Sequence, residues 1–144
     1  MSKEPHRHTI LYAEDDIDDL FLVQQAFEQY GGSVVLVHAS NGFEVLKELQ
    51  RLINGKTTPC LIILDINMPG MDGKEALIRL KQSDKFRNIP VTLFTTSSSD
   101  ADRAFANKWG AGFITKPLVF SELEELARSF LRLCNEPELP VKSS

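Results

Sequence analysis

Four short β-prone runs in this sequence end directly in side chains that can bind a cation or a phosphoryl group. One run ends in Glu14-Asp15-Asp16 and another in Asp65, and two later runs end in Thr95-Thr96 and Lys116-Pro117. Carboxylates gathered in one shallow site repel one another unless a cation lies between them, and Mg²⁺ suits an all-oxygen site because it keeps several waters. An ammonium and a hydroxyl beside such a carboxylate can neutralise a phosphoryl group. The carboxylate can then act as the nucleophile and form an acyl phosphate.

Strands and helices must alternate along the chain for these side chains to meet. Apolar runs predict strands over 9–13, 34–39, 60–64, 91–95 and 113–115. Amphipathic spacing and capping residues predict a helix that ends at Gly31-Gly32 and further helices over about 43–52, 72–83, 99–109 and 121–131. Such alternation predicts an α/β fold with one parallel sheet, right-handed crossovers and helices on both faces. Ligands of such sheets bind outside the carboxyl ends of the strands, which is where the polar groups lie.

Helix caps account for some of the acids without any ligand. Asp16 and Asp19 have the spacing of an N-cap and the third helical position, and we interpret Asp16 as a cap rather than a metal ligand. The same spacing occurs in the pairs Asn41/Glu44, Asp72/Glu75 and Ser121/Glu124. Asp65 has no such explanation, because it follows a fully apolar run.

Length, charge and cysteine usage limit the class of protein. The chain has 144 residues, 16 Lys and Arg against 20 Asp and Glu, and 42% hydrophobic residues, which predicts one globular domain over 9–134 with flexible ends over 1–8 and 135–144. A net charge of −4 argues against a nucleic-acid-binding surface. The longest apolar run, 60–64, is too short to span a membrane, and residues 1–8 show no secretory signal. Cys60 and Cys134 form no C-x-x-C pattern, so we expect no disulfide framework and a reduced, cytoplasmic location.

The motifs at the strand ends resemble those of one family. Glu14-Asp15, the block Asp65-Ile-Asn67-Met-Pro-Gly-Met-Asp72-Gly73, Thr95 and Lys116-Pro117 follow the order and approximate spacing of CheY-like receiver domains of two-component response regulators, over about residues 9–133. The resemblance implies a doubly wound, flavodoxin-like fold of five parallel strands in the order 2-1-3-4-5. The acid-rich stretch 15–19 and the polar loop 54–59 are similar to those of stand-alone bacterial receivers related to those that serve bacteriophytochrome-type kinases.

The resemblance assigns the phosphorylation chemistry to four acidic or amide residues. Asp65 resembles the phosphoacceptor, and Asp15 resembles a direct ligand of Mg²⁺. Glu14 resembles the acid that acts through metal-bound water, and Asn67 would offer its backbone carbonyl to the metal. The protein is then expected to be a phosphoacceptor with self-catalysed phosphoryl transfer and slow autodephosphorylation, not a conventional enzyme.

Three further residues take their expected roles from the same resemblance. Lys116 resembles the lysine that contacts the phosphoryl group, and its peptide bond to Pro117 is cis in the family. Thr95 and Phe113 resemble the switch pair, in which a hydroxyl and an aromatic ring move together after phosphorylation. The connection 110–113 is one residue shorter than is usual in the family, and Phe113 lacks the hydroxyl of a tyrosine.

The resemblance also implies protein partners, with no nucleic acid and no membrane. A sensor histidine kinase or a phosphotransfer protein would donate the phosphoryl group. The expected kinase-docking surface is the exposed face of the first helix, which carries Asp18, Asp19, Leu22 and Gln25. No output domain follows Cys134, so the signal is expected to pass by contact to a downstream protein, through the helix over 99–109, the strand over 113–115 and the last helix. The same two helices offer a surface for a homodimer.

Two other functions compete with this interpretation. A magnesium-dependent phosphatase with an aspartyl nucleophile needs a second acid two residues after the nucleophile, and Asn67 occupies that position. A binding module that works without phosphorylation would not need the full set Glu14, Asp15, Asp65, Thr95 and Lys116. Both therefore fit the residues less well than a phosphoacceptor does.

Overall fold

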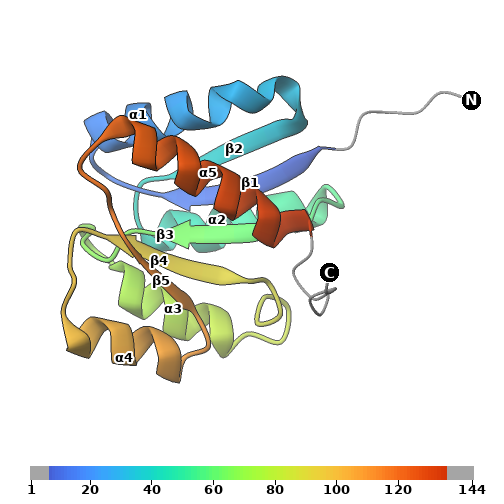
Figure 1. Cartoon of the computed structure of the whole chain (residues 1–144). Helices are drawn as coiled ribbons and strands as arrows, with labels where there is room; N and C mark the ends of the chain where they lie inside the picture. The colour runs from blue at the N-terminus through green and yellow to red at the C-terminus, as the bar shows by residue number, and fades with distance from the viewer. Residues whose placement is uncertain (1–6, 136–144) are drawn as a thin grey trace, which may run out of the picture.

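A parallel sheet of five strands forms the centre of the molecule, in the order β2-β1-β3-β4-β5 (Figure 1). The computed structural model describes residues 7–135. The strands are β1 His8–Ala13, β2 Val34–Ala39, β3 Leu61–Leu64, β4 Val91–Thr95 and β5 Gly112–Thr115. The fold class and strand order predicted from the sequence are confirmed. The order places β1 and β3 side by side in the middle of the sheet, with their carboxyl ends at one edge.

Helices cover both faces of this sheet. They are α1 Ile17–Phe27, α2 Gly42–Asn54, α3 Gly73–Lys81, α4 Asp100–Lys108 and α5 Phe120–Asn135, and a 3₁₀ segment, η1 Glu28–Ser33, follows α1. The buried side chains of α1 and α5 pack in one core cluster, and those of α2, α3 and α4 pack in the other. Within residues 7–135, no helix is long and apolar enough to cross a bilayer.

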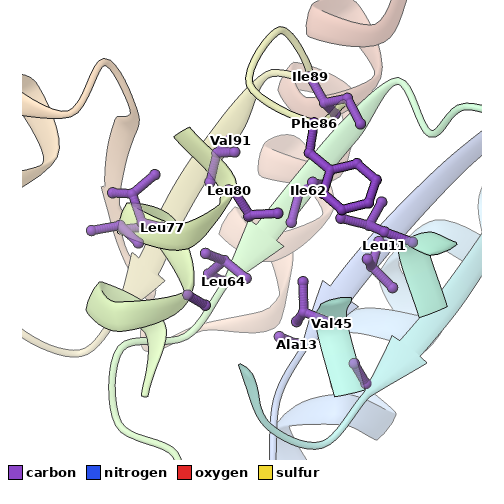
Figure 2. Packing of buried hydrophobic residues seen from close by; sticks show 14 of the residues in the cluster. Leu11, Ala13, Val45, Ile62, Leu64, Leu77, Leu80, Phe86, Ile89 and Val91 are labelled. Carbon is purple, nitrogen blue, oxygen red and sulfur yellow. The ribbon is translucent and has the colours of Figure 1, made fainter. Parts of the chain in front are cut away.

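The central strands β1, β3 and β4 are buried on both faces from Ile10, Leu61 and Val91 onward, whereas the edge strands β2 and β5 are partly exposed. Alternate residues of β1 and β3 enter opposite clusters, so that Ile10 and Tyr12 face α1 and α5 while Leu11 faces α2 and α3. Figure 2 shows the packing on the face covered by α2 and α3, with labels on Leu11, Ala13, Val45, Ile62, Leu64, Leu77 and Leu80 among others. The same alternation continues past the strand ends, and it directs Glu14 to the side of the sheet that Tyr12 occupies.

Most of the predicted helix caps are present. Asp16 accepts hydrogen bonds from the amides of Asp18 and Asp19, and Asn41 and Asp72 accept from the third residues of their helices. The predicted cap at Ser121 is wrong, because α5 begins one residue earlier and Ser121 lies inside its first turn. The first turn closes on the backbone carbonyl of Val119 instead, which accepts from the amides of Glu122 and Leu123.

The ends of the domain differ slightly from the predicted boundaries. His8 was expected in a flexible N-terminus, but it is the first residue of β1 and is the register partner of Val34. Asn135 was expected in the C-terminal tail, but it is the last residue of α5. The remaining parts of the two predicted flexible ends, residues 1–6 and 136–144, lie outside the described residues.

Cys60 and Cys134 form a disulfide, which corrects the expectation of no disulfide. Cys60 directly precedes β3, and Cys134 lies in the last turn of α5. Their Cα atoms are 5.0 Å apart although 74 residues separate them in sequence. Cys spacing predicted no bridge because the contact depends on how α5 packs over the sheet, which sequence separation does not report. The inference of a reducing compartment from these cysteines loses its support.

Replacing both cysteines by alanine is expected to lower the free energy of unfolding by about 2–4 kcal/mol, because a bridge across so long a loop restricts the unfolded chain. Urea unfolding without reductant measures the difference. Reductant should bring the wild-type protein close to the Cys60→Ala/Cys134→Ala variant and leave the variant unchanged. Two titratable thiols in the folded wild-type protein without reductant would contradict the bridge.

Candidate functional site

An acid-lined cavity lies at the carboxyl ends of β1 and β3, beside the residue that follows β5. Its lining residues are Glu14, Asp15, Asp16, Ile17, Asp19, Asp65, Asn67, Thr96 and Lys116. The structure therefore brings together groups from all four strand ends that the sequence singled out. Five carboxylates share this cavity with one lysine, so the lining carries an excess of negative charge.

Three carboxylates are close enough to share one metal ion. Glu14, Asp15 and Asp65 each offer an oxygen, and these oxygens lie within 4.8 Å of one another. Glu14 and Asp65 are 1% and 6% exposed, whereas Asp15 is exposed to solvent. A half-open group of hard oxygen donors fits a divalent cation that retains several waters. Asn67 lines the same cavity and is exposed.

The ammonium of Lys116 lies among three of the carboxylates. Its Nζ is 2.8 Å from Glu14 Oε1, 2.9 Å from Asp19 Oδ2 and 3.5 Å from Asp65 Oδ2. Burial alone would lower the pKa of Lys116, but hydrogen bonds to Glu14 and Asp19 outweigh it and raise the pKa above its ordinary value. Lys116 is therefore a permanent positive charge in the cavity.

Burial has the opposite consequence for Asp65. It raises the pKa of Asp65 to about 7; the nearby charge of Glu14 adds to the rise, and Lys116 opposes it. Without a metal ion, the negative charge of the ionised Asp65 is thus only partly balanced by Lys116. A divalent cation bound to the three carboxylates would relieve this repulsion and favour the ionised, nucleophilic form.

A glycine sets the backbone around Asp65. The amide of Gly73 donates to the carbonyl of Ile66, which brings the start of α3 against the end of β3. A Cβ on Gly73 would lie 2.1 Å from the backbone oxygen of Asp65, so no other residue fits without a shift. The glycine in the Asp72-Gly73 pair is thus required by the close approach of two backbones.

Sequence reasoning did not identify Tyr12 as part of the site. The hydroxyl of this buried residue donates to Glu14 Oε1 over 2.8 Å, and the amide of Asp16 donates to Oε2 over 3.1 Å. On the neighbouring strand, His38 Nε2 lies 2.7 Å from the backbone oxygen of Glu14. Glu14 is therefore fixed at both its side chain and its main chain. Strand alternation was the available signal, since residues 12 and 14 share a face.

Replacing Tyr12 by phenylalanine is expected to lower the free energy of unfolding by about 1–2 kcal/mol, because the buried Glu14 carboxylate loses a donor. Urea unfolding in the presence of a chelator measures this. Tyr30→Phe is the matched control, since Tyr30 lies in η1 away from the cavity, and it should change stability much less. Equal effects of the two variants would contradict the orienting role of Tyr12.

The two adjacent threonines at the end of β4 differ in position. Thr95 is fully buried, and its Oγ1 accepts a hydrogen bond from the amide of Ser97 over 3.2 Å. Thr96 is exposed and lines the cavity. Thr95 therefore does not supply the cavity hydroxyl in this structure, and its predicted switch role stays a prediction.

Phe113 lies in β5 beside the β4 strand that carries Thr95. Leu93 and Phe113 are register partners, as are Thr95 and Thr115, so alternation places Phe113 and Thr95 on the same face of the sheet. Phe113 is half-buried against the core, and the Arg103 guanidinium lies 4.7 Å from its ring centroid. The short connection before it is closed by Gly110, whose φ is +72°.

The expected docking residues on α1 do not all share one environment. Asp18 and Leu22 are exposed, with Leu22 at 42%, and Gln25 is half-buried. Asp19 instead lines the acid cavity and pairs with Lys116. Its side chain thus belongs to the cavity, because the third position of α1 projects toward the strand ends.

The expectation of a cis bond between Lys116 and Pro117 is wrong for this structure: among residues 7–135 every peptide bond is trans. The Lys116 amide still donates to the carbonyl of Thr95 over 2.7 Å, so the chain leaves the sheet in register. The trans isomer is the one that X-Pro bonds favour by about 0.5–1 kcal/mol. Leu118 and Val119, which follow Pro117, lie exposed.

Comparison with known proteins agrees with the fold and the motifs. Residues 10–128 match the family described as the response regulator receiver domain. The chain is 35% identical to "Probable methanogenesis regulatory protein FilR2" of Methanothrix harundinacea over 118 aligned residues. The aligned stretch covers 80% of this chain and 76% of FilR2. Against several other curated relatives, the chain spans between 16% and 51% of their length.

Two solved structures are similar over nearly their whole length. The phosphorylated cyanobacterial phytochrome response regulator RcpA has a TM-score of 0.82 at 25% identity, with 92% of this chain and 97% of that chain covered. The Mn²⁺-bound form of response regulator Rcp1 has a TM-score of 0.78 at 28% identity, with 93% and 99% covered.

Proposed function

Because this chain belongs to the response regulator receiver domain family, we propose that Asp65 accepts a phosphoryl group from the phosphohistidine of a sensor histidine kinase or phosphotransfer protein. The observation that carries the proposal is the placement of Asp65 within ion-pair distance of Lys116 and beside the oxygens of Glu14 and Asp15. The protein is a signalling protein, and the proposed transfer is catalysed by its own residues.

We propose Mg²⁺ as the cofactor of this reaction. Asp15, Asp65 and the backbone carbonyl of Asn67 would hold the ion directly, and Glu14 would act through bound water. The acidic cluster and the Mn²⁺-bound structure of Rcp1 support a divalent cation here. The ion would neutralise charge on the phosphoryl oxygens during transfer.

The residues of the cavity divide the proposed reaction between them. The Asp65 carboxylate attacks phosphorus, an O–P bond forms, the P–N bond of the phosphohistidine breaks and the imidazole leaves. Lys116 offers its ammonium to the phosphoryl oxygens, whose negative charge it stabilises. Asn67, two residues after Asp65, cannot take a proton from water, so hydrolysis of the acyl phosphate is slow.

We propose that the signal leaves through the surface formed by α4, β5 and α5. Thr95 would turn toward the new phosphoryl group and Phe113 would follow, which biases an existing two-state equilibrium. The downstream protein would bind this surface, and a homodimer through α4 and α5 would use it as well. The kinase would dock on α1 around Asp18, Leu22 and Gln25, in the cytoplasm, where the exposed Leu22 offers an apolar contact.

Incubation with acetyl phosphate and Mg²⁺ tests the proposed function. We expect a mass gain of about 80 Da, one phosphoryl group, that peptide mapping places on Asp65 and that hydroxylamine removes as from an acyl phosphate. No gain, or a gain on a hydroxyl residue, would contradict the proposal. Multiple turnover on a small phosphoester would favour the phosphatase alternative instead.

A further inference from the structure

Lys116 is held by a carboxylate that is not among the expected ligands of the metal. Asp19 Oδ2 lies 2.9 Å from Lys116 Nζ, and this contact joins residues 97 apart in the chain. Glu14 Oε1 takes a second hydrogen bond from the same ammonium over 2.8 Å. Asp65 Oδ2 is farther away, at 3.5 Å. The lysine is thus bound to Asp19 and Glu14 more closely than to the residue that is to carry phosphorus.

The position of Asp19 is fixed by the start of α1. Its amide donates to Asp16 Oδ1 over 3.1 Å, so the cap orients the residue. The side chain is 37% exposed, whereas that of Lys116 is only 11% exposed. The pair therefore joins a partly exposed carboxylate to a largely buried ammonium in the cavity lining, and it is screened by solvent less than a surface pair is.

A phosphoryl group on Asp65 needs the same ammonium. Glu14 and Asp19 compete with the phosphoryl oxygens for the donors of Lys116, and the Asp19 charge also repels an incoming anionic phosphodonor. Glu14 is already satisfied by Tyr12 and the Asp16 amide when Lys116 moves away. Asp19 has no other side-chain partner among the described residues, so its carboxylate is left without a side-chain hydrogen bond.

We propose that Asp19 is a positioning residue that holds Lys116 away from Asp65 and thereby slows phosphorylation. This inference rests on the proposed function of Asp65. It assigns to Asp19 a role in the cavity rather than in kinase docking. The negative charge of Asp19 both holds Lys116 and slows the reaction. Removing that charge alone should therefore release Lys116.

Asp19→Asn tests the proposal, with Asp84→Asn as its control. Both variants remove one carboxylate charge, but Asp84 is 92% exposed and does not line the cavity. We expect Asp19→Asn to raise the rate constant of phosphorylation by acetyl phosphate about ten-fold, the low end of what one charge-assisted hydrogen bond contributes, and Asp84→Asn to change it less than about two-fold. Equal rates for the two variants, or a slower reaction in Asp19→Asn, would overturn the proposal.

A second measurement uses no metal and no phosphodonor. The midpoint of thermal unfolding in the presence of a chelator should fall more for Asp19→Asn than for Asp84→Asn, and that difference should disappear in a Lys116→Gln background. Persistence of the difference without Lys116 would show that Asp19 acts through another contact. If the wild-type protein takes no phosphoryl group on Asp65, the proposed function fails. If the wild-type protein is phosphorylated and the Asp19→Asn variant reacts at the same rate, only the role of Asp19 is refuted.

Discussion

Asp65→Asn is expected to take up no phosphoryl group and, without metal, to be more stable than the wild-type protein. The amide cannot form the acyl phosphate, so the gain of about 80 Da should vanish completely. The variant also removes a buried charge whose pKa is raised to about 7, first by burial and then by Glu14. Lys116 keeps its closer contacts to Glu14 and Asp19 in the variant.

The pH dependence of this difference has a definite sign. An unfolded aspartate titrates near 4, so between pH about 4 and about 7 the folded wild-type protein binds more protons than the unfolded chain. Stability of the metal-free protein therefore falls as pH rises through this window. Asp65→Asn lacks this fall, and its advantage should reach about 1–3 kcal/mol at pH about 8.

Urea unfolding at pH about 5 and about 8, with a chelator present, measures the difference. Asp84→Asn is the control, because Asp84 is 92% exposed and its ion pair with Arg87 contributes little. A wild-type protein whose advantage over Asp65→Asn grows with pH would contradict the electrostatics of the cavity. A phosphoryl gain that survives in Asp65→Asn would place the phosphoacceptor elsewhere.

Lys116→Met is expected to slow phosphorylation by acetyl phosphate about 10²- to 10³-fold, the effect of removing one preorganised charge donor from a transition state. The methionine has a similar length and fills the space beside Phe94, whose ring centroid lies 5.8 Å from Lys116 Nζ. The side chain of Glu14 is fully buried and loses its counter-ion, so the metal-free variant should also be less stable.

The phosphorylation rate at saturating Mg²⁺ separates the loss of catalysis from the loss of stability, because this rate is measured on the folded variant. Lys74→Met is the control: Lys74 pairs with Asp102 on the α4 side of the molecule and does not line the cavity. The Lys74→Met variant should be phosphorylated at nearly the wild-type rate. A loss in Lys116→Met no larger than that in Lys74→Met would show that the ammonium does not act on the phosphoryl group.

The fold could be predicted because its signals are local. A continuous apolar run marked β3, and a β-prone run marked β4. Asp16, Asn41 and Asp72 marked three helix starts, because their side chains accept hydrogen bonds from backbone amides two or three residues further on. The cap expected at Ser121 is absent because α5 begins at Phe120, and the carbonyl of Val119 accepts from the amides of Glu122 and Leu123.

The site could be predicted as a set of residues but not as a set of contacts. Parallel strands bring their carboxyl ends to one edge, so the alternation of strands and helices predicts that Glu14, Asp65 and Lys116 lie near one another. Which carboxylate the lysine prefers depends on the rotation of its side chain, and which of the two threonines faces the cavity depends on the backbone at the end of β4. No periodicity in the sequence encodes either of these.

Short-range patterns and the geometry of parallel sheets predicted the alternation of strands and helices, the edge at which chemistry is to be sought and the acids, amide and lysine that gather there. The strand order came from the family resemblance. Three contacts became apparent only from the three-dimensional packing: the disulfide of Cys60 and Cys134, the hydrogen bond from Tyr12 to Glu14 and the pairing of Asp19 with Lys116. The two long-range contacts depend on how α5 and α1 settle on the sheet, and the Tyr12 contact depends on the side-chain conformation that this packing allows.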